Sequence, residues 1–146
     1  MKHKKVIFRF IFIFLITSSF GSKAQEYLGW SCRNEIEVMC SKSGCGVSQK
    51  EEFTPVDVTL LKDGSMDVCA YSGCWSGRGT VTKLASFTIF TGEKFKFSSP
   101  PGNSATEDIS VVVDERDNVA VMKNSVFAQP LICNKIEKDK PESISK

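Results

Sequence analysis

Histidine is almost absent from this chain of 146 residues, in which His3 is the only one. His3 lies in an N-terminal segment that we expect to be removed, so the mature protein is expected to contain no histidine. A protein without histidine cannot use a Ser-His or Cys-His catalytic pair. It also cannot build the common histidine-containing zinc sites. We therefore expect a protein that is not an enzyme and that carries no metal or cofactor.

The chain also lacks an apolar run long enough to cross a bilayer, which requires roughly 18–20 residues. Its longest run follows Arg9 and spans about a dozen residues. Ser22 and Ala24 come next and form the small-x-small pattern of a secretory cleavage site. We predict a signal peptide over residues 1–24, a mature chain that begins at Gln25, and no membrane attachment after export.

An excess of basic residues is missing from the predicted mature chain. Five of the 19 Lys and Arg residues fall in the signal peptide together with none of the 17 acidic residues, so residues 25–146 carry a net charge of −3. Binding to nucleic acid or to anionic membranes requires clustered positive charge. We therefore expect neither kind of partner.

Cysteine is plentiful. All six cysteines lie in the predicted mature chain, at Cys32, Cys40, Cys45, Cys69, Cys74 and Cys133. An even number in an exported chain indicates disulfides. Two pairs share the pattern C-x-x-S-G-C, in which Ser-Gly can supply a tight turn. A zinc site of four thiolates is the alternative, but exported thiols are oxidised and zinc pairs are usually spaced C-x2-C.

The preferred disulfide pairing joins each C-x-x-S-G-C pair within itself, as Cys40–Cys45 and Cys69–Cys74. Cys32–Cys133 remains, and it would tie the two ends of the domain together. That bridge closes a loop of about 100 residues, which gives it a large effect on the entropy of the unfolded chain.

Alternation of apolar and polar residues predicts β structure throughout the mature chain, with no helical periodicity. Strands are expected at 35–38, 56–60, 65–71, 80–90, 94–97, 109–113, 119–122 and 125–133. Asp63-Gly64 predicts a hairpin, the regions 74–79, 91–93 and 114–118 are expected to turn, and Pro130 indicates a sheet edge or a bulge.

These features indicate an all-β fold, a small antiparallel barrel or sandwich of about eight strands stabilised by disulfides. A single β domain is expected over 25–133, followed by a disordered charged tail over 134–146. The expected core consists of Ile36, Val38, Val56, Val58, Leu60, Met66, Val68, Phe87, Ile89, Phe95, Phe97, Val111, Val113, Val119, Val121 and Phe127.

Two segments resemble ligand-binding loops. Asp114–Asn118 is acidic enough to suggest calcium, but it lacks EF-hand spacing and is better explained as a solvated hairpin turn. Ser76–Gly79 is rich in glycine, but it lacks the phosphate-binding pattern and a following helix. Neither is predicted to bind a ligand.

The segment from Tyr71 to Arg78 is the best candidate for a binding surface. It brings Tyr71, Trp75 and Arg78 into eight residues, and these residue types are enriched at binding hot spots. A Cys69–Cys74 disulfide would make part of this loop rigid and lower the entropy lost on binding. The alternative is that Trp75 closes one end of the barrel. The loop at Pro100–Asn103 is the next candidate.

The lysine-rich leader, its Phe/Ile run and the small cysteine-bearing body resemble Sec-dependent secreted effectors of phloem-limited plant-pathogenic alphaproteobacteria. The resemblance implies a virulence effector that inhibits a host papain-like cysteine protease involved in defence. The cystatin-type Gln-x-Val-x-Gly loop is absent. The early and late cysteines around a meander of strands are also similar to periplasmic lysozyme inhibitors, although the Ser-Gly-x-x-Tyr pattern of those proteins is not matched.

Three functions follow as expectations. The first is a secreted effector that inhibits a host protein, most concretely a papain-like cysteine protease. The second is a periplasmic binding or inhibitor barrel that stays in the cell envelope. The third is a carboxylate-based hydrolase, which would need two carboxylates close together in a cleft.

Overall fold

The computed structural model describes residues 26–49, 51–98, 105–125 and 127–138. The predicted signal peptide, the candidate loop at 100–103 and the tail beyond 138 lie outside the described residues. The described part contains no helix. Its strands are β1 (Tyr27–Arg33), β2 (Ile36–Ser41), β3 (Gly44–Gln49), β4 (Asp57–Leu61), β5 (Ser65–Ala70), β6 (Gly73–Arg78), β7 (Thr80–Leu84), β8 (Phe87–Ser98), β9 (Thr106–Asp114), β10 (Val119–Lys123) and β11 (Ala128–Glu137).

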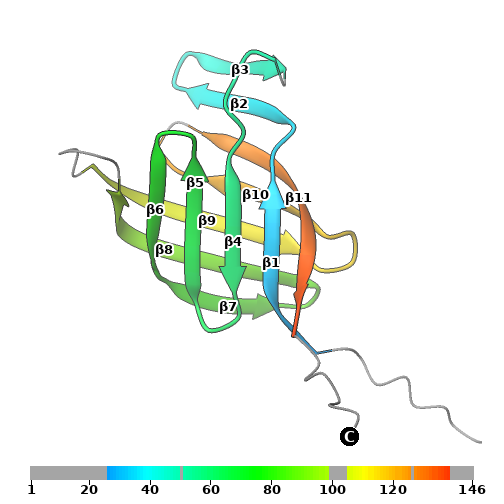
Figure 1. Cartoon of the computed structure of the whole chain (residues 1–146). Coiled ribbons are helices and arrows are strands. Elements are labelled where there is room, and N and C mark those ends of the chain that lie inside the picture. Colours follow the sequence, from blue (N-terminus) through cyan, green and yellow to red (C-terminus); the bar gives the residue numbers. More distant parts are fainter. Residues whose placement is uncertain (1–25, 50, 99–104, 126, 139–146) are drawn as a thin grey trace, which may run out of the picture.

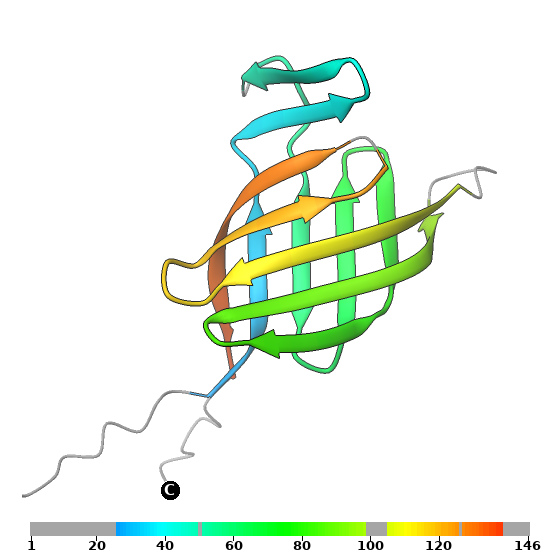
Figure 2. The same ribbon diagram turned by 180° about the vertical axis from the view of Figure 1, so that it is seen from behind.

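Eight of the strands close into an antiparallel barrel, seen from two sides in Figures 1 and 2. Neighbours follow the order β6-β5-β4-β1-β11-β10-β9-β8, and pairing of β6 with β8 joins the two edges. β7 is an extra strand that pairs with β8, while β2 and β3 form a separate hairpin beyond one end of the barrel. The all-β prediction is confirmed, and the architecture is a barrel.

The barrel closes at a bend between β6 and β7. β8 pairs with both strands, through Trp75 opposite Phe97 and Thr80 opposite Thr91. Gly79 lies at the bend, where an added Cβ would come within 2.2 Å of the Thr91 carbonyl oxygen. The glycine-rich segment Ser76–Gly79 therefore serves barrel closure, because only glycine permits this approach of two backbones.

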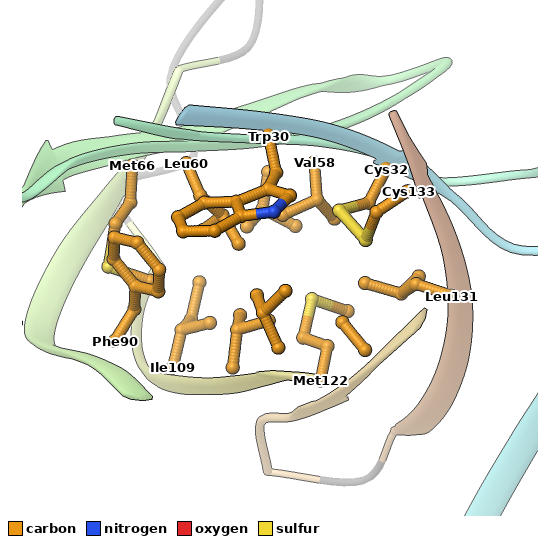
Figure 3. Packing of buried hydrophobic residues seen from close by; sticks show 14 of the residues in the cluster. Trp30, Cys32, Val58, Leu60, Met66, Phe90, Ile109, Met122, Leu131 and Cys133 are labelled. Atoms are coloured by element: carbon orange, nitrogen blue, oxygen red, sulfur yellow. A yellow bond between two sulfur atoms is a disulfide. The ribbon is translucent and has the colours of Figure 1, made fainter. Parts of the chain in front are cut away.

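Side chains fill the barrel interior (Figure 3). The largest are Trp30 and Phe90, whose rings meet edge to face with centroids 5.9 Å apart. Seven predicted core residues are buried, namely Val58, Leu60, Met66, Val68, Phe95, Val111 and Val113. The prediction missed Trp30, Cys32, Phe90, Ile109, Ala120, Met122, Leu131 and Cys133, which complete the cluster.

The predicted inward face of β8 is wrong for its first half. Phe90 is buried, whereas Phe87 and Ile89 are partly exposed. A β-bulge between Gly92 and Phe95 inserts one extra residue, so alternation extended backwards from Phe95 selects the wrong face. The predicted turn at 91–93 is wrong for the same reason, because the chain continues through the bulge as one strand.

The predicted inward face of β10 is also wrong. Val119 and Val121 are exposed, while Ala120 and Met122 point into the core. All four residues are apolar, so alternation alone could not choose between the faces. Five further expected core residues are only half-buried, namely Ile36, Val38, Val56, Phe97 and Phe127.

Three strands, β1, β3 and β6, were not predicted, and the turn expected at 74–79 is wrong. Each contains glycine, which is unfavourable in strands unless another group approaches closely. A Cβ on Gly29 of β1 would come within 1.9 Å of the Leu60 carbonyl oxygen. A Cβ on Gly77 of β6 would come within 2.7 Å of the Phe95 ring. In β1 and β6, glycine reflects close packing inside a strand, whereas Gly44 and Gly46 of β3 have open space around them.

The last strand is longer than predicted. β11 continues to Glu137, so residues 134–137, which were assigned to the tail, belong to the barrel. Pro130 lies opposite Val121 of β10, while the pairing of β11 with β1 begins only at Ile132. Pro130 therefore occupies a locally unpaired edge, as its missing N–H requires.

The three predicted disulfides are confirmed as Cys32–Cys133, Cys40–Cys45 and Cys69–Cys74. Each joins residues directly opposite on neighbouring antiparallel strands. No cysteine is left as a thiolate, which removes the four-thiolate zinc alternative. Disulfides persist in oxidising compartments, so the protein belongs outside the cytoplasm. Within the described residues, no helix is long and apolar enough to span a bilayer.

Candidate binding surface at the mouth of the barrel

The pattern C-x-x-S-G-C encodes the same structure twice. In β2–β3 the staple Cys40–Cys45 lies behind a two-residue turn at 42–43, and in β5–β6 the staple Cys69–Cys74 lies behind a turn at 71–72. The glycine that follows each turn has a positive φ, 137° at Gly44 and 151° at Gly73. Both turns lie toward the same end of the barrel, which we call the mouth end (Figures 1 and 2).

The three predicted contact residues occupy different places. Tyr71 is in the β5–β6 turn and is 96% exposed. Trp75 is half-buried and packs on Phe97 with ring centroids 4.5 Å apart, so much of it belongs to the barrel wall. Arg78 lies at the opposite end of β6 from the turn and pairs with Asp63 at 2.8 Å. The structure therefore leaves Tyr71 at the mouth end and Arg78 at the far end.

The β2–β3 hairpin is the most prominent element at the mouth end. Within the described residues, its strands pair in no ladder with the barrel strands, and one isolated backbone bridge joins Met39 to Phe127. Its strands carry exposed apolar side chains, with Met39 47% and Val47 58% exposed. Strand alternation puts Val47 and the Cys40–Cys45 disulfide on one face and Met39 on the other.

Two buried amides fix the hairpin base to the barrel. Asn34 accepts a hydrogen bond from the Val56 N–H at 2.7 Å and donates one to the Ile36 carbonyl at 2.9 Å. Gln129 of β11 accepts from the Val38 N–H at 3.0 Å and from the Asn34 amide at 3.4 Å. Asn34 and Gln129 are 2% and 0% exposed. This junction gives the projecting hairpin a defined direction.

A cavity of about 620 Å³ lies at the mouth end and is called the mouth pocket here. Apolar side chains from the barrel, from the β3–β4 connection and from Phe127 just before β11 line it, together with three carboxylates. Its lining includes Glu37, Glu51, Glu52, Phe53, Val56, Val68, Trp75, Met122, Asn124 and Phe127. Among the described lining residues, none is positively charged.

The carboxylates of the mouth pocket are not enclosed as a catalytic acid would be. Glu51 and Glu52 are exposed, and Glu52 accepts a hydrogen bond from the Gln49 N–H at 3.2 Å. Glu37 is half-buried on the hairpin face that carries Met39. A carboxylic general acid is usually kept protonated by apolar surroundings. The arrangement is better suited to attracting a cation than to transferring a proton.

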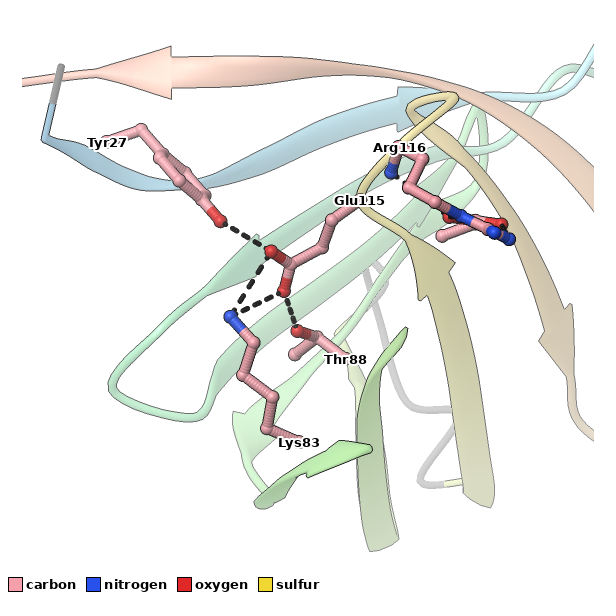
Figure 4. Close-up of polar contacts among 6 residues, drawn as sticks. Tyr27, Lys83, Thr88, Glu115 and Arg116 are labelled. Atoms are coloured by element: carbon pink, nitrogen blue, oxygen red, sulfur yellow. Dashed lines mark hydrogen bonds and ion pairs between the residues drawn. The ribbon is translucent and has the colours of Figure 1, made fainter. Parts of the chain in front are cut away.

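The far end of the barrel carries a different polar cluster (Figure 4). Glu115 accepts hydrogen bonds from Tyr27 at 3.3 Å, from Thr88, and from Lys83, whose ammonium lies 3.0 Å away. Burial raises the pKa of Glu115, but the hydrogen bonds from Thr88 and Lys83 and the charge of Lys83 outweigh it and hold the pKa below its ordinary value. Burial raises the pKa of Tyr27, and the charge of Glu115 adds to the effect.

The polar groups of the far-end cluster contact one another within the chain, which indicates a structural role. The Lys62 ammonium covers the Tyr27 ring, 3.3 Å from its centroid. In the nearby acidic turn, Asp114 pairs with Arg116 at 2.7 Å, so the segment considered for calcium neutralises part of its own charge. In the part of the chain that the structure describes, no group of three or more potential ligands is placed to hold a metal ion.

Of the residues at the mouth end, Tyr71 belongs to the predicted binding segment, whereas the pocket carboxylates were not predicted. Tyr71 was identified because aromatic residues near a short disulfide loop are visible in a linear pattern. The pocket carboxylates come from two separate segments, and nothing in their spacing links them to Trp75. Their only sequence signal is the Glu51-Glu52 pair directly before Phe53, which is also typical of an exposed loop.

Compared with protein-family models, curated proteins and solved structures, the chain matches none.

Proposed function

We propose that this protein is an exported binding protein that inhibits a partner protein by inserting its mouth end into the partner's cleft. Papain-like cysteine proteases are the proposed partner class, and binding rather than catalysis is the proposed activity. The observation that carries the proposal is the β2–β3 hairpin, which stands beyond the barrel, leaves most of β3 exposed and is stapled by Cys40–Cys45.

A rigid projection suits insertion into a cleft because the projection is already ordered in the folded protein, so binding loses less conformational entropy. The disulfide limits splaying of β2 and β3, and the Asn34–Gln129 junction limits swinging of the hairpin against the barrel. The neighbouring β5–β6 turn places Tyr71 at the same end of the molecule. The two stapled turns can therefore contact a partner together.

The staple also suits an inhibitor that meets a protease. If the protease cuts the chain between Cys40 and Cys45, the disulfide keeps the new ends together. A cut chain held in place can be rejoined or stay bound, whereas an unlinked one would leave the cleft. The unpaired edge of β3, which pairs only with β2 among the described strands, offers backbone hydrogen bonds to an extended cleft.

A periplasmic inhibitor barrel is the second candidate. The closed eight-stranded barrel is as compatible with this function as with an effector. The two differ in compartment, because the effector must leave the cell envelope. Fractionation of the producing cells, with the protein found in the medium or retained in the periplasm, separates them.

Inhibition kinetics test the proposal directly. The exported protein should inhibit a papain-like protease at micromolar concentration or below, in competition with a peptide substrate. A protease whose active-site cleft has been blocked covalently is the control and should no longer bind. Failure to inhibit at micromolar concentration would refute the protease proposal, and equal binding to the blocked protease would refute insertion into the cleft.

A further inference from the structure

We propose that the mouth pocket binds a small amphipathic cation, an organic amine carried on an apolar body. This inference goes beyond the proposed inhibition and does not depend on it. It rests on the shape of the pocket, on its apolar floor and on the sign of the charge around it.

The size of the cavity fits a small molecule. Pockets for small ligands usually measure about 300–1,000 Å³ and combine apolar walls with a few polar groups. The mouth pocket, at about 620 Å³, lies inside that range. Its floor is apolar, with Val68 and Met122 contributed by the buried core and Trp75 and Phe127 by the half-buried wall. The apolar body of a ligand placed there would be removed from contact with water.

The charge at the pocket determines which polar group of a ligand is favoured. Glu37 comes from β2, and Glu51 and Glu52 come from the connection between β3 and β4. Arg33 pairs with Asp57, whereas Lys123 lies beside the lining residue Asn124 and donates to the carbonyls of Asn124 and Ser125, with no acidic partner in the described part of the chain. Three carboxylates therefore outnumber the one ammonium among these described groups, so a cation is favoured over an anion at this end.

The two parts of the site are complementary to a single ligand class. An amine alone would gain little from exposed carboxylates in water. An apolar body alone would use the floor but ignore the charges. A molecule with both parts can place its body over Trp75 and its ammonium among the glutamates.

Titration with three matched probes tests the proposal. We would compare 4-phenylbutylamine with the corresponding alcohol and carboxylic acid, using calorimetry and the indole N–H signals in NMR. The chain has two tryptophans, Trp30 in the core and Trp75 in the pocket, and a Trp75→Phe variant assigns the two signals. The amine should bind with a dissociation constant below about 1 mM and shift the Trp75 signal but not the Trp30 signal.

Charge variants complete the test. The double variant Glu37→Gln with Glu52→Gln keeps an oxygen acceptor for the Gln49 N–H and should weaken amine binding about five- to tenfold, with little effect on the alcohol. Glu137→Gln, at the exposed end of β11, is the matched control and should bind as wild type does. No amine binding up to about 10 mM, an unmoved Trp75 signal, or equal binding of all three probes to the wild type would each overturn the proposal.

Discussion

Replacing Asn34 by alanine should loosen the β2–β3 hairpin while leaving the barrel fold intact. Asn34 is 2% exposed, and its side chain satisfies the Val56 N–H and the Ile36 carbonyl. Alanine would leave both backbone groups without this partner and would remove one donor to Gln129. The hairpin base would then lose a large part of its attachment.

The magnitude follows from the burial of these groups. An unsatisfied buried backbone group costs about 1–3 kcal/mol. Val56 and Ile36 are half-buried, so water can reach them in part and the lower end of the range applies. We expect a loss of about 2–3 kcal/mol in the free energy of unfolding. For a domain of this size, that loss corresponds to a fall of about 10 °C in the melting temperature.

Thermal melts and amide hydrogen exchange measure the two parts of this prediction. Exchange should accelerate more at Val38 in β2 than at Leu60 in β4, because the junction holds the hairpin and the core holds the barrel. Asn134→Ala, at an exposed position of β11, is the matched control and should change neither measurement. A variant at Asn34 that melts within about 2 °C of wild type with unchanged exchange would refute the role of the junction.

Three further predictions concern the barrel. Glu115→Gln should destabilise the protein at pH 7, as measured by thermal melts. The folded-state pKa of Glu115 is lowered, so the stability that the wild type gains from this carboxylate is present above the unfolded-state pKa. The difference in melting temperature between wild type and variant should vanish as the pH falls from about 5 to about 3. Replacing Cys32 and Cys133 by alanine removes a disulfide that spans 101 residues and should lower the free energy of unfolding, measured with denaturant, by about 4–5 kcal/mol. Removing either short-loop disulfide should lower it by only about 2 kcal/mol, and equal losses would contradict the entropic account. Gly79→Ala should lower the free energy of unfolding by about 2 kcal/mol or more, because the new Cβ would lie 2.2 Å from a backbone oxygen. Gly46 has open space around it, so Gly46→Ala should have the melting temperature of the wild type.

The parts of the fold that depend on local chemistry could be predicted from sequence. Asp63-Gly64 forms the turn between β4 and β5, and both C-x-x-S-G-C segments form stapled hairpins. In each case a short run of residues determines the backbone conformation of its own turn. The long-range Cys32–Cys133 bridge followed by elimination once the local pairs had been assigned.

The parts that depend on neighbours in space could not be predicted in the same way. Gly29 weakens the strand signal of β1, yet it is there because the backbone of β4 passes too close for a side chain. The bulge after Gly92 changes which residues of β8 face inward, and no local pattern announces it. The mouth pocket is assembled from separate segments by closure of the barrel, so its carboxylates could not be linked to Trp75 beforehand.

The central claim is that the mouth end, and not the far end, contacts the inhibited partner. The most direct measurement is the inhibition constant of four exposed-site variants against a papain-like protease, with a thermal melt of each. Tyr71→Ala and Val47→Ala change the mouth end at side chains 96% and 58% exposed, and Arg78→Ala and Leu84→Ala change the far end, where Leu84 is 62% exposed. At least one mouth-end variant should lose about thirtyfold in affinity while melting as wild type does, and both far-end variants should inhibit fully. Equal inhibition by all four, or a loss confined to the far-end pair, would contradict the account.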